Sequence, residues 1–306
     1  MAILTPPIKS QGIKSKLVPW IQEILSCLCV HPRNWREPFL GTGVIPLNIP
    51  FHTYVLSDAN PHIIRFYSAL KSGEITSRRI KKFLSQEGEA LKRKGEEHYY
   101  FVRDRFNINY DPLDFLFLNR ACFNGMIRFN KKGEFNVPFC KKPARFSGQY
   151  ITKIVNQSKR MEEFLQTYTV FLACMDFREA LKNMGEDDII YCDPPYIDRY
   201  SDYYNSWSSK DEEDLYHILN MTNSKFILST WHHNKFRRNT YIDMYWKRFN
   251  IYEKEHFYHL GGEISHRNTM IESLVTNIEN KLYKEKYFYT QQKQKQLPLS
   301  FADALP

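Results

Sequence analysis

The feature that most constrains the fold of this chain is a series of short apolar runs separated by helix-favouring segments. The segment NWREPFLGTG (34–43) is expected to form a short strand that ends in a glycine turn, and the segment VIPLNI after that turn is expected to form a helix. Further strands are expected in TYVLSD (53–58), TVFLACMD (169–176), DIIYCD (188–193), KFILSTW (225–231) and MIESLVTN (270–277). Strands alternating with helices predict an α/β fold, with a mostly parallel twisted sheet and helices on both faces.

A long helical segment interrupts this strand pattern. Residues 61–115 have a helical pattern, and an aromatic, Asn- and Gly-rich stretch follows, in which Lys131-Lys132-Gly133 predicts a hairpin turn. We therefore divide the chain into a discontinuous catalytic and cofactor-binding domain, a mainly helical insert with a β-hairpin, and a polar tail. Their boundaries are 1–65 plus 169–280, 66–168, and 281–306.

The net positive charge of the chain lies in the insert. Residues 66–170 hold 20 Lys/Arg against 11 Asp/Glu, which accounts for the whole formal net charge of +9. A localised basic block with interleaved aromatic residues predicts contact with a polyanion. For a single run such as Lys92-Arg93-Lys94, a solvated helix face is the preferred interpretation.

Composition excludes several other classes of protein. The six cysteines form no Cys-x-x-Cys pair, which favours reduced thiols in a cytoplasmic protein. No apolar run reaches membrane-spanning length, and the N-terminus lacks the apolar core of a signal peptide. The histidines at 232–233 and the three at 256, 259 and 266 lack the accompanying acids or cysteines of a metal site, so no metal is expected.

A glycine turn and an acid suggest a nucleoside-bearing ligand. Gly41 and Gly43 follow the first strand, where doubly wound folds bind nucleotides, and Asp58 closes the second strand, where an acid can accept hydrogen bonds from ribose hydroxyls. The chain has no GxxxxGK[ST] phosphate loop and lacks the third glycine of the dinucleotide fingerprint. S-adenosylmethionine is a cofactor that needs no phosphate cradle.

The tetrapeptide Asp193-Pro194-Pro195-Tyr196 follows an apolar strand and suits chemistry at a planar amine. An exocyclic amine is a poor nucleophile while its lone pair is conjugated into the ring. The Asp193 carboxylate and the Pro194 carbonyl, fixed in direction by the two prolines, can accept its two N–H groups. Tyr196 can stack on a base rotated out of a duplex.

These residues carry a resemblance to a known family. PPIKSQGIKSKL (6–17), EPFLGTG (37–43), SDAN (57–60), NRACFNGMIRFNKKGEFNVPF (119–139), CMDF (174–177) and YCDPPY (191–196) resemble, in this order, the motifs of Dam-type (D12, or α-class) DNA adenine-N6 methyltransferases. The resemblance covers residues from about 5 to 277. It implies a Rossmann-like S-adenosylmethionine-dependent methyltransferase fold.

The resemblance also implies roles for single residues. Lys14 would lie at the methionine end of S-adenosylmethionine, in the N-terminal motif that also contains Ser10. The remaining cofactor residues would be Phe39, Gly41 and Gly43 in the turn, Asp58 at the ribose, Asp176 and Phe177 at the adenine, and Asp193 close to the cofactor. Residues 193–196 would bind the target adenine.

The insert resembles the recognition hairpin of this family. Phe123 would take the place of an aromatic residue that wedges into the duplex, Asn124 would lie near base pairs, and Arg128 would reach a guanine edge. Lys141 and Lys142 would follow phosphates. For Asn136, Val137 and Pro138, a structural role in the hairpin is the preferred interpretation.

The resulting hypothesis is an enzyme that transfers a methyl group from S-adenosylmethionine to N6 of a flipped-out adenine in double-stranded DNA. It would be the modification component of a restriction-modification system, with the cognate restriction endonuclease as a genetic rather than a physical partner. A solitary methyltransferase stays open, because the catalytic motifs are the same for both. We expect a cytoplasmic, nucleoid-associated monomer or weak dimer that needs no membrane.

Two alternatives stay open, an RNA adenine-N6 methyltransferase and a sequence-specific DNA-binding protein that has lost catalysis. A cytosine-N4 enzyme usually has Ser in place of Asp193. No Cys is placed as the nucleophile of C5-cytosine methylation.

Overall fold

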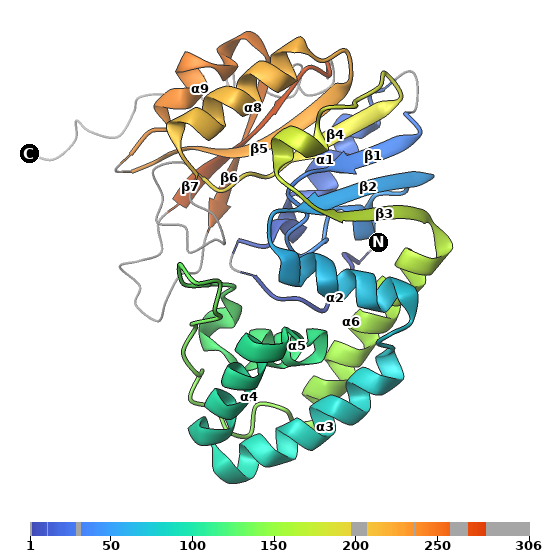
Figure 1. Cartoon of the computed structure of the whole chain (residues 1–306). Coiled ribbons are helices and arrows are strands. Elements are labelled where there is room, and N and C mark those ends of the chain that lie inside the picture. Colours follow the sequence, from blue (N-terminus) through green and yellow to red (C-terminus); the bar gives the residue numbers. More distant parts are fainter. Residues whose placement is uncertain are drawn as a thin grey trace, which may run out of the picture.

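The computed structural model describes residues 2–10, 12–28, 32–196, 207–235, 237–257 and 269–279 (Figure 1). The tail predicted at 281–306 lies outside these residues. The described part contains one seven-stranded sheet. Its strands are β1 (Asn34–Glu37), β2 (Thr53–Asp58), β3 (Thr169–Cys174), β4 (Asp188–Cys192), β5 (Lys225–Asn234), β6 (Asn250–Phe257) and β7 (Thr269–Thr276).

The strands lie in the order β3-β2-β1-β4-β5-β7-β6. Strands β1 to β5 pair in parallel, whereas β7 pairs antiparallel with both β5 and β6. Crossing from β3 back to β4 on the far side of β1 reverses the direction of winding, which places ligands of such folds at the carboxyl ends of β1, β2 and β4. The predicted Rossmann-like methyltransferase fold is thus confirmed. Strand β6 was not predicted.

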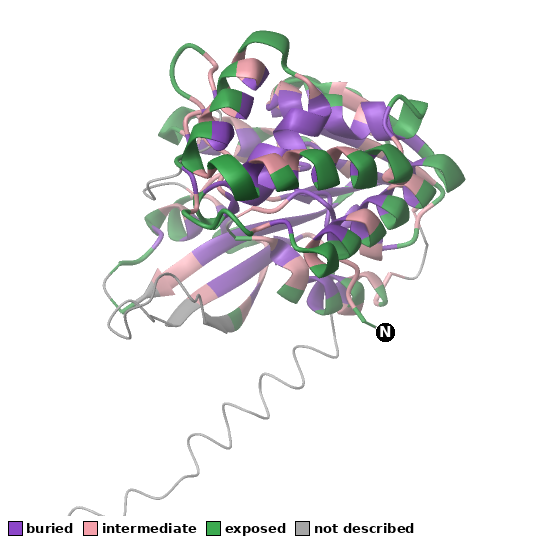
Figure 2. Ribbon diagram, turned by 90° about the horizontal axis from the view of Figure 1, so that it is seen from below, coloured by how far each residue is buried: buried purple, intermediate pink, exposed green. Residues whose placement is uncertain are grey.

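Alternate residues of the central strands face two separate apolar cores. Ile189 and Tyr191 of β4 pack in one core, together with residues of α1 (Val18–Leu25) and α2 (Pro61–Ser72). Ile190 and Cys192 pack in the other, together with residues of α8 (Ser209–Met221). Figure 2 shows buried residues along the strands and exposed residues on the outer faces of the helices. Helices therefore cover both faces of the sheet, as predicted.

The shorter helices around the sheet are α7 (Phe177–Ala180), α9 (Thr240–Met244), and the 3₁₀ turns η1 (Lys14–Lys16), η2 (Pro46–Asn48) and η4 (Trp246–Arg248). The prediction of a helix in VIPLNI is wrong, because this segment forms only the single turn η2. Pro46 and Pro50 leave few residues for a longer helix, and the Asn48 side chain donates to the carbonyls of Leu4 and Val44. In contrast, α2 starts where Asn60 caps the amide of His62 and Pro61 takes the first helical position.

The insert consists of four helices and a hairpin-like loop. The helices are α3 (Ser77–Lys94), α4 (Glu96–Asn109), α5 (Pro112–Ala121) and α6 (Gly148–Thr167), and the 3₁₀ turn η3 (Phe123–Gly125) starts the loop. Two isolated antiparallel bridges, Cys122 with Phe139 and Phe129 with Phe135, hold the loop together. Its turn at 131–133 is the predicted one, with Gly133 at φ 77°.

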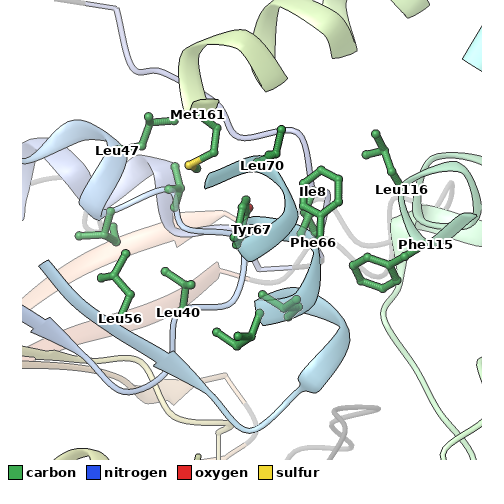
Figure 3. Packing of buried hydrophobic residues seen from close by; sticks show 14 of the residues in the cluster. Ile8, Leu40, Leu47, Leu56, Phe66, Tyr67, Leu70, Phe115, Leu116 and Met161 are labelled. Carbon is green, nitrogen blue, oxygen red and sulfur yellow. The ribbon is translucent and has the colours of Figure 1, made fainter. Parts of the chain in front are cut away.

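One apolar core joins the insert to the sheet. Phe66 and Tyr67 of α2 lie between Leu56 of β2 and Phe115 and Leu116 of α5 (Figure 3). Met161 of α6 belongs to the same cluster. Helix α2 continues across the boundary that we predicted between residues 65 and 66, and the division into domains stays a prediction.

Candidate active site

The carboxyl end of β4 brings together three of the residues expected at the reacting end of the site. The Lys14 ammonium lies 3.4 Å from Asp193 Oδ1 and 4.2 Å from the centre of the Tyr196 ring, whose hydroxyl accepts a hydrogen bond from Lys14 Nζ. Lys14 is buried, with 8% of its surface exposed. Residues 182 positions apart in sequence therefore form one cluster.

Asp193 is held from the side of β5. Ser229 is fully buried, and its Oγ donates to Asp193 Oδ1 over 2.6 Å. The Tyr191 hydroxyl donates in turn to Ser229 Oγ over 3.2 Å. Burial raises the pKa of Asp193, whereas Lys14 and the Ser229 hydrogen bond lower it and so favour the charged carboxylate. Pro194 is buried and Pro195 half-buried, which fixes the backbone beyond this carboxylate.

A fourth member of the cluster, Glu272 of β7, was missed in the sequence. Its Oε1 lies 3.4 Å from Lys14 Nζ and accepts from the Tyr196 hydroxyl at 3.3 Å. Glu272 is one acid in the apolar strand MIESLVTN, and its contact with Lys14 spans 258 residues. Neither Glu272 nor Ser229 belongs to a local motif, so no pattern in the sequence could have identified them.

The glycine turn and Asp58 lie together at the ends of β1 and β2. The Gly41 amide donates to Asp58 Oδ2 over 2.7 Å, and the Asn60 amide donates to Oδ1 over 2.8 Å. Burial raises the pKa of Asp58 to about 6, although both amides favour the charged form. Asp58 thus fixes the two loops, and each oxygen keeps a lone pair for a ligand hydroxyl.

The backbone of this turn has an open face. Gly41 has φ 50° and Gly43 φ 71°, which is the left-handed region that favours glycine. A Cβ built at Gly41 meets no other atom within 4 Å, whereas one at Gly43 lies 3.3 Å from Met161 Cε. The open space at Gly41, beside an oriented carboxylate, fits the nucleoside of S-adenosylmethionine, the cofactor that the sequence suggests.

Aromatic residues border the same edge of the sheet. The rings of Phe39 and Phe177 lie 5.5 Å apart, and Trp207 lies within 5.6 Å of both. Asp176 lies two residues beyond β3 and is exposed. Its side chain caps the amide of Arg178 and forms an ion pair with the Arg178 guanidinium.

Glu37 at the end of β1 is buried, and its carboxylate accepts a hydrogen bond from Trp35 Nε1. Burial raises the pKa of Glu37 well above its usual range. Ser10 is half-buried in the N-terminal segment.

The residues expected to contact DNA lie in the hairpin-like loop. Phe123 is 51% exposed, and Asn124 beside it has φ 53°. The Arg128 guanidinium donates to Asn136 twice, to Oδ1 over 2.9 Å and to the carbonyl oxygen over 3.1 Å. Lys141 and Lys142 are both exposed.

The loop is anchored to the helices of the insert. The buried Val137 accepts from the Tyr99 hydroxyl through its carbonyl, and the Pro138 carbonyl accepts from the Phe123 amide. These contacts support the structural interpretation of Val137 and Pro138. Asn136 has a second role, because its two hydrogen bonds with Arg128 orient that guanidinium.

The family model of D12 class N6 adenine-specific DNA methyltransferases matches residues 10–260 of the chain. The chain belongs to this family. Its relatives include a DNA adenine methylase of Vibrio cholerae, which is 36% identical over 196 residues, or 62% of this chain and 64% of that protein. The chain thus spans less than two thirds of the length of this relative.

Two further relatives match a larger share of this chain. A DNA adenine methylase of Haemophilus influenzae is 29% identical, covering 70% of this chain and 76% of its own length. The type II methyltransferase M.MjaIII of Methanocaldococcus jannaschii is 30% identical, covering 73% and 83%. Among solved structures, an rRNA methyltransferase of Streptomyces viridochromogenes aligns with 90% of this chain and 89% of its own, at 10% identity and a TM-score of 0.39.

Among the described residues, no group of three or more His, Cys, Asp or Glu side chains has an arrangement that could hold a metal ion. None of their helices is long and apolar enough to cross a membrane.

Proposed function

We propose that this chain transfers a methyl group from S-adenosylmethionine to N6 of an adenine flipped out of double-stranded DNA. The observation that carries the proposal is the cluster of Lys14, Asp193 and Tyr196 beside the turn formed by Gly41 and Asp58. One part suits a nucleoside cofactor and the other suits an aromatic amine, and they lie at neighbouring strand ends of one sheet.

The residues at the end of β4 act on the amine. Asp193 accepts one N–H of the flipped base, and the Pro194 carbonyl accepts the other, so the nitrogen lone pair is drawn out of conjugation. The base stacks on Tyr196, which requires the Lys14 ammonium to leave the face of that ring. When bound, S-adenosylmethionine supplies an electrophilic methyl group next to Asp193.

The remaining predicted residues complete the cofactor pocket. Asp58 binds the ribose, the turn from Phe39 to Gly43 passes under the nucleoside, and Lys14 and Ser10 lie toward the methionine end. Asp176 and Phe177 border the adenine of the cofactor, where the aromatic neighbours of Phe177 favour a planar ring.

The insert 66–168 recognises the target. Phe123 enters the duplex, Asn124 and Arg128 contact base edges, and Lys141 and Lys142 contact phosphates. Exposure of Phe123 and of both lysines supports these roles. We further propose a cytoplasmic monomer or weak dimer that provides the modification activity of a restriction-modification system, with residues 1–65 and 169–280 as the catalytic domain.

The test uses the purified chain, labelled S-adenosylmethionine, and either unmethylated plasmid DNA or RNA. Mass spectrometry of the nucleosides should detect N6-methyladenine in the DNA alone. Asp193→Ala should lower the rate at least about a hundredfold, because it removes an acceptor that binds the amine more strongly as the reaction proceeds. DNA binding should be retained.

Asp187→Ala is the matched control, since Asp187 is exposed just before β4, at the opposite end of that strand. It should behave as wild type. A near wild-type rate in Asp193→Ala contradicts the mechanism, and methylation of RNA alone favours the alternative substrate.

A further inference from the structure

Asn119 and Arg120 open the block NRACFNGMIRFNKKGEFNVPF, yet neither has a role in the proposed reaction. Both lie at the end of α5, where Asn119 is fully buried and Arg120 is 5% exposed. Polar side chains are costly to bury unless their groups are hydrogen-bonded. The partners of these two side chains therefore indicate what they do.

Asn119 pairs with the backbone of a residue 110 positions away. Its Oδ1 accepts from the Lys9 amide over 2.8 Å, and its Nδ2 donates to the Lys9 carbonyl over 2.7 Å. Nδ2 also donates, over 3.4 Å, to the carbonyl of Gly125 at the end of η3. One side-chain amide thus joins the N-terminal segment, residues 4–10, to the hairpin-like loop.

The same two parts of the chain are in close contact through Lys9 and Gly125. Gly125 has φ 68°, and a Cβ built there would lie 2.5 Å from Lys9 Cδ and 2.8 Å from Lys9 Cγ. The stem of the Lys9 side chain therefore lies directly on the backbone of Gly125, and a larger residue at 125 would displace it. Phe123, which we propose to enter the duplex, is two residues before this contact.

Other side chains of the insert hold the rest of the N-terminal segment. Arg120 Nε donates to the Pro7 carbonyl over 2.7 Å, and Arg120 Nη2 donates to Gln157 Oε1 over 2.6 Å. Gln157, in α6, donates in turn to Thr5 Oγ1 over 2.8 Å. Residues 5–9 are thus fixed to the insert, although the chain continues from them into η1 and α1, on the side of the sheet.

The N-terminal segment therefore lies between the two proposed ligand sites. Lys9 contacts the loop that we propose to bind DNA, and five residues later Lys14 lies in the proposed cofactor pocket. Ordering a segment costs conformational entropy, which weakens binding of the first ligand that requires it. A second ligand that requires the same order binds without that cost.

We propose that Asn119 is a positioning residue that makes the hairpin-like loop and the N-terminal segment move as one unit, so that bound DNA strengthens binding of the cofactor. By linkage, the bound cofactor strengthens binding of DNA by the same factor. This inference rests on the proposed function, which supplies the two ligands, and it adds a physical connection between target recognition and the cofactor site.

The test measures the affinity for S-adenosylhomocysteine, which cannot react, by isothermal titration calorimetry with and without DNA. The DNA is a duplex that contains the target site, found by sequencing the DNA of cells that express the chain. The duplex should strengthen binding to the wild type at least about fivefold. In Asn119→Leu, which has no group to pair with Lys9, this gain should fall below about twofold, and the affinity without DNA should stay within about threefold of wild type.

Asn48→Leu is the matched control. Asn48 pairs with Leu4 in the same way, since its Oδ1 accepts from the Leu4 amide over 2.8 Å and its Nδ2 donates to the Leu4 carbonyl over 2.9 Å. Asn48 lies in η2, outside the insert. Loss of this pair should lower stability and leave the gain from DNA at its wild-type value.

Hydrogen exchange of the wild type provides a second measurement, which needs no variant to fold. S-adenosylhomocysteine alone should slow exchange of the Phe123 amide, which donates to the Pro138 carbonyl, at least about twofold. Unchanged exchange overturns the inference, as does a loss of affinity in Asn119→Leu that is equal with and without DNA. If the wild type does not bind S-adenosylhomocysteine, the proposed function itself fails, whereas binding with no gain from DNA overturns this inference alone.

Discussion

Replacing Ser229 by alanine tests how much of the reaction depends on the orientation of Asp193. Ser229 contacts Asp193 Oδ1 at 2.6 Å in a fully buried position, so the variant removes one hydrogen bond to a carboxylate without opening the site to solvent. A hydrogen bond to a charged group is worth about 1.5–3 kcal/mol. A loss of about 2 kcal/mol in the transition state corresponds to about a 30-fold lower rate.

The variant also changes the pH dependence in a definite direction. The Ser229 hydrogen bond lowers the pKa of Asp193, so its removal raises that pKa. Because Asp193 must be ionised to accept the amine, the acid limb of the rate profile should move to higher pH in Ser229→Ala. A purely structural role for Ser229 would lower the rate equally at every pH.

Single-turnover methyl transfer, with enzyme in excess over a duplex that contains the target site, measures the chemical step. Single-molecule sequencing of DNA from cells that express the chain provides the target site first.

Tyr191→Phe should lower the rate of methyl transfer by only about two- to fivefold. It removes a neutral hydrogen bond to Ser229, one step farther from Asp193.

Ser273→Ala is the matched control. Ser273 is a buried serine of the same sheet, and the described residues offer its hydroxyl no hydrogen-bond partner. A wild-type rate and pH profile in Ser229→Ala refutes the reasoning, as does an equal loss in Ser273→Ala.

Two further predictions concern the insert and the cofactor turn. Arg128→Ala should relax the preference for one base by about 1–3 kcal/mol, measured by competition binding between duplexes. Asn136→Ala should relax the preference at the same position, because Asn136 orients Arg128. Uniform weakening of binding across all sequences would instead assign Arg128 to a phosphate contact. For Asp58, whose pKa is about 6 when folded and about 3.9 when unfolded, the native state binds more protons between these values, so its contribution to the free energy of unfolding falls as pH rises. The stability of Asp58→Asn minus that of wild type, from urea unfolding, should therefore increase with pH up to about 6 and then level off; a flat difference contradicts the assignment.

The strands of the sheet were predictable where the pattern is local. TYVLSD is apolar, is bounded by its terminal acid, and forms β2 at the predicted residues. Strand β6 was missed because NIYEKEHF has charged residues at its centre, which are tolerated at the edge of a sheet, where a single neighbour pairs with the strand. The apolar pattern of VIPLNI predicts a helix, but its proline limits the segment to the single turn η2.

In the candidate site, too, the residues that belong to local motifs could be predicted and those with long-range contacts could not. Asp58, Gly41 and the residues from Asp193 belong to motifs whose spacing implies a common strand edge, and the structure brings them to that edge. Ser229 and Glu272 contact partners 36 and 258 residues away, respectively, and nothing in their own segments indicates those partners.

The seam between α2 and β3 has a consequence for protein engineering. Lys71, near the end of α2, donates to the carbonyl of Val170 in β3 over 2.5 Å, so the chain leaves the sheet and returns to it at almost the same place. A segment whose ends lie this close can be exchanged with little effect on the path of the remaining chain. Residues 73–168, between the end of α2 and the start of β3, are therefore the natural unit to exchange in a test of the proposed target recognition. Helix α2 should be kept, because the apolar core continues from the sheet through it.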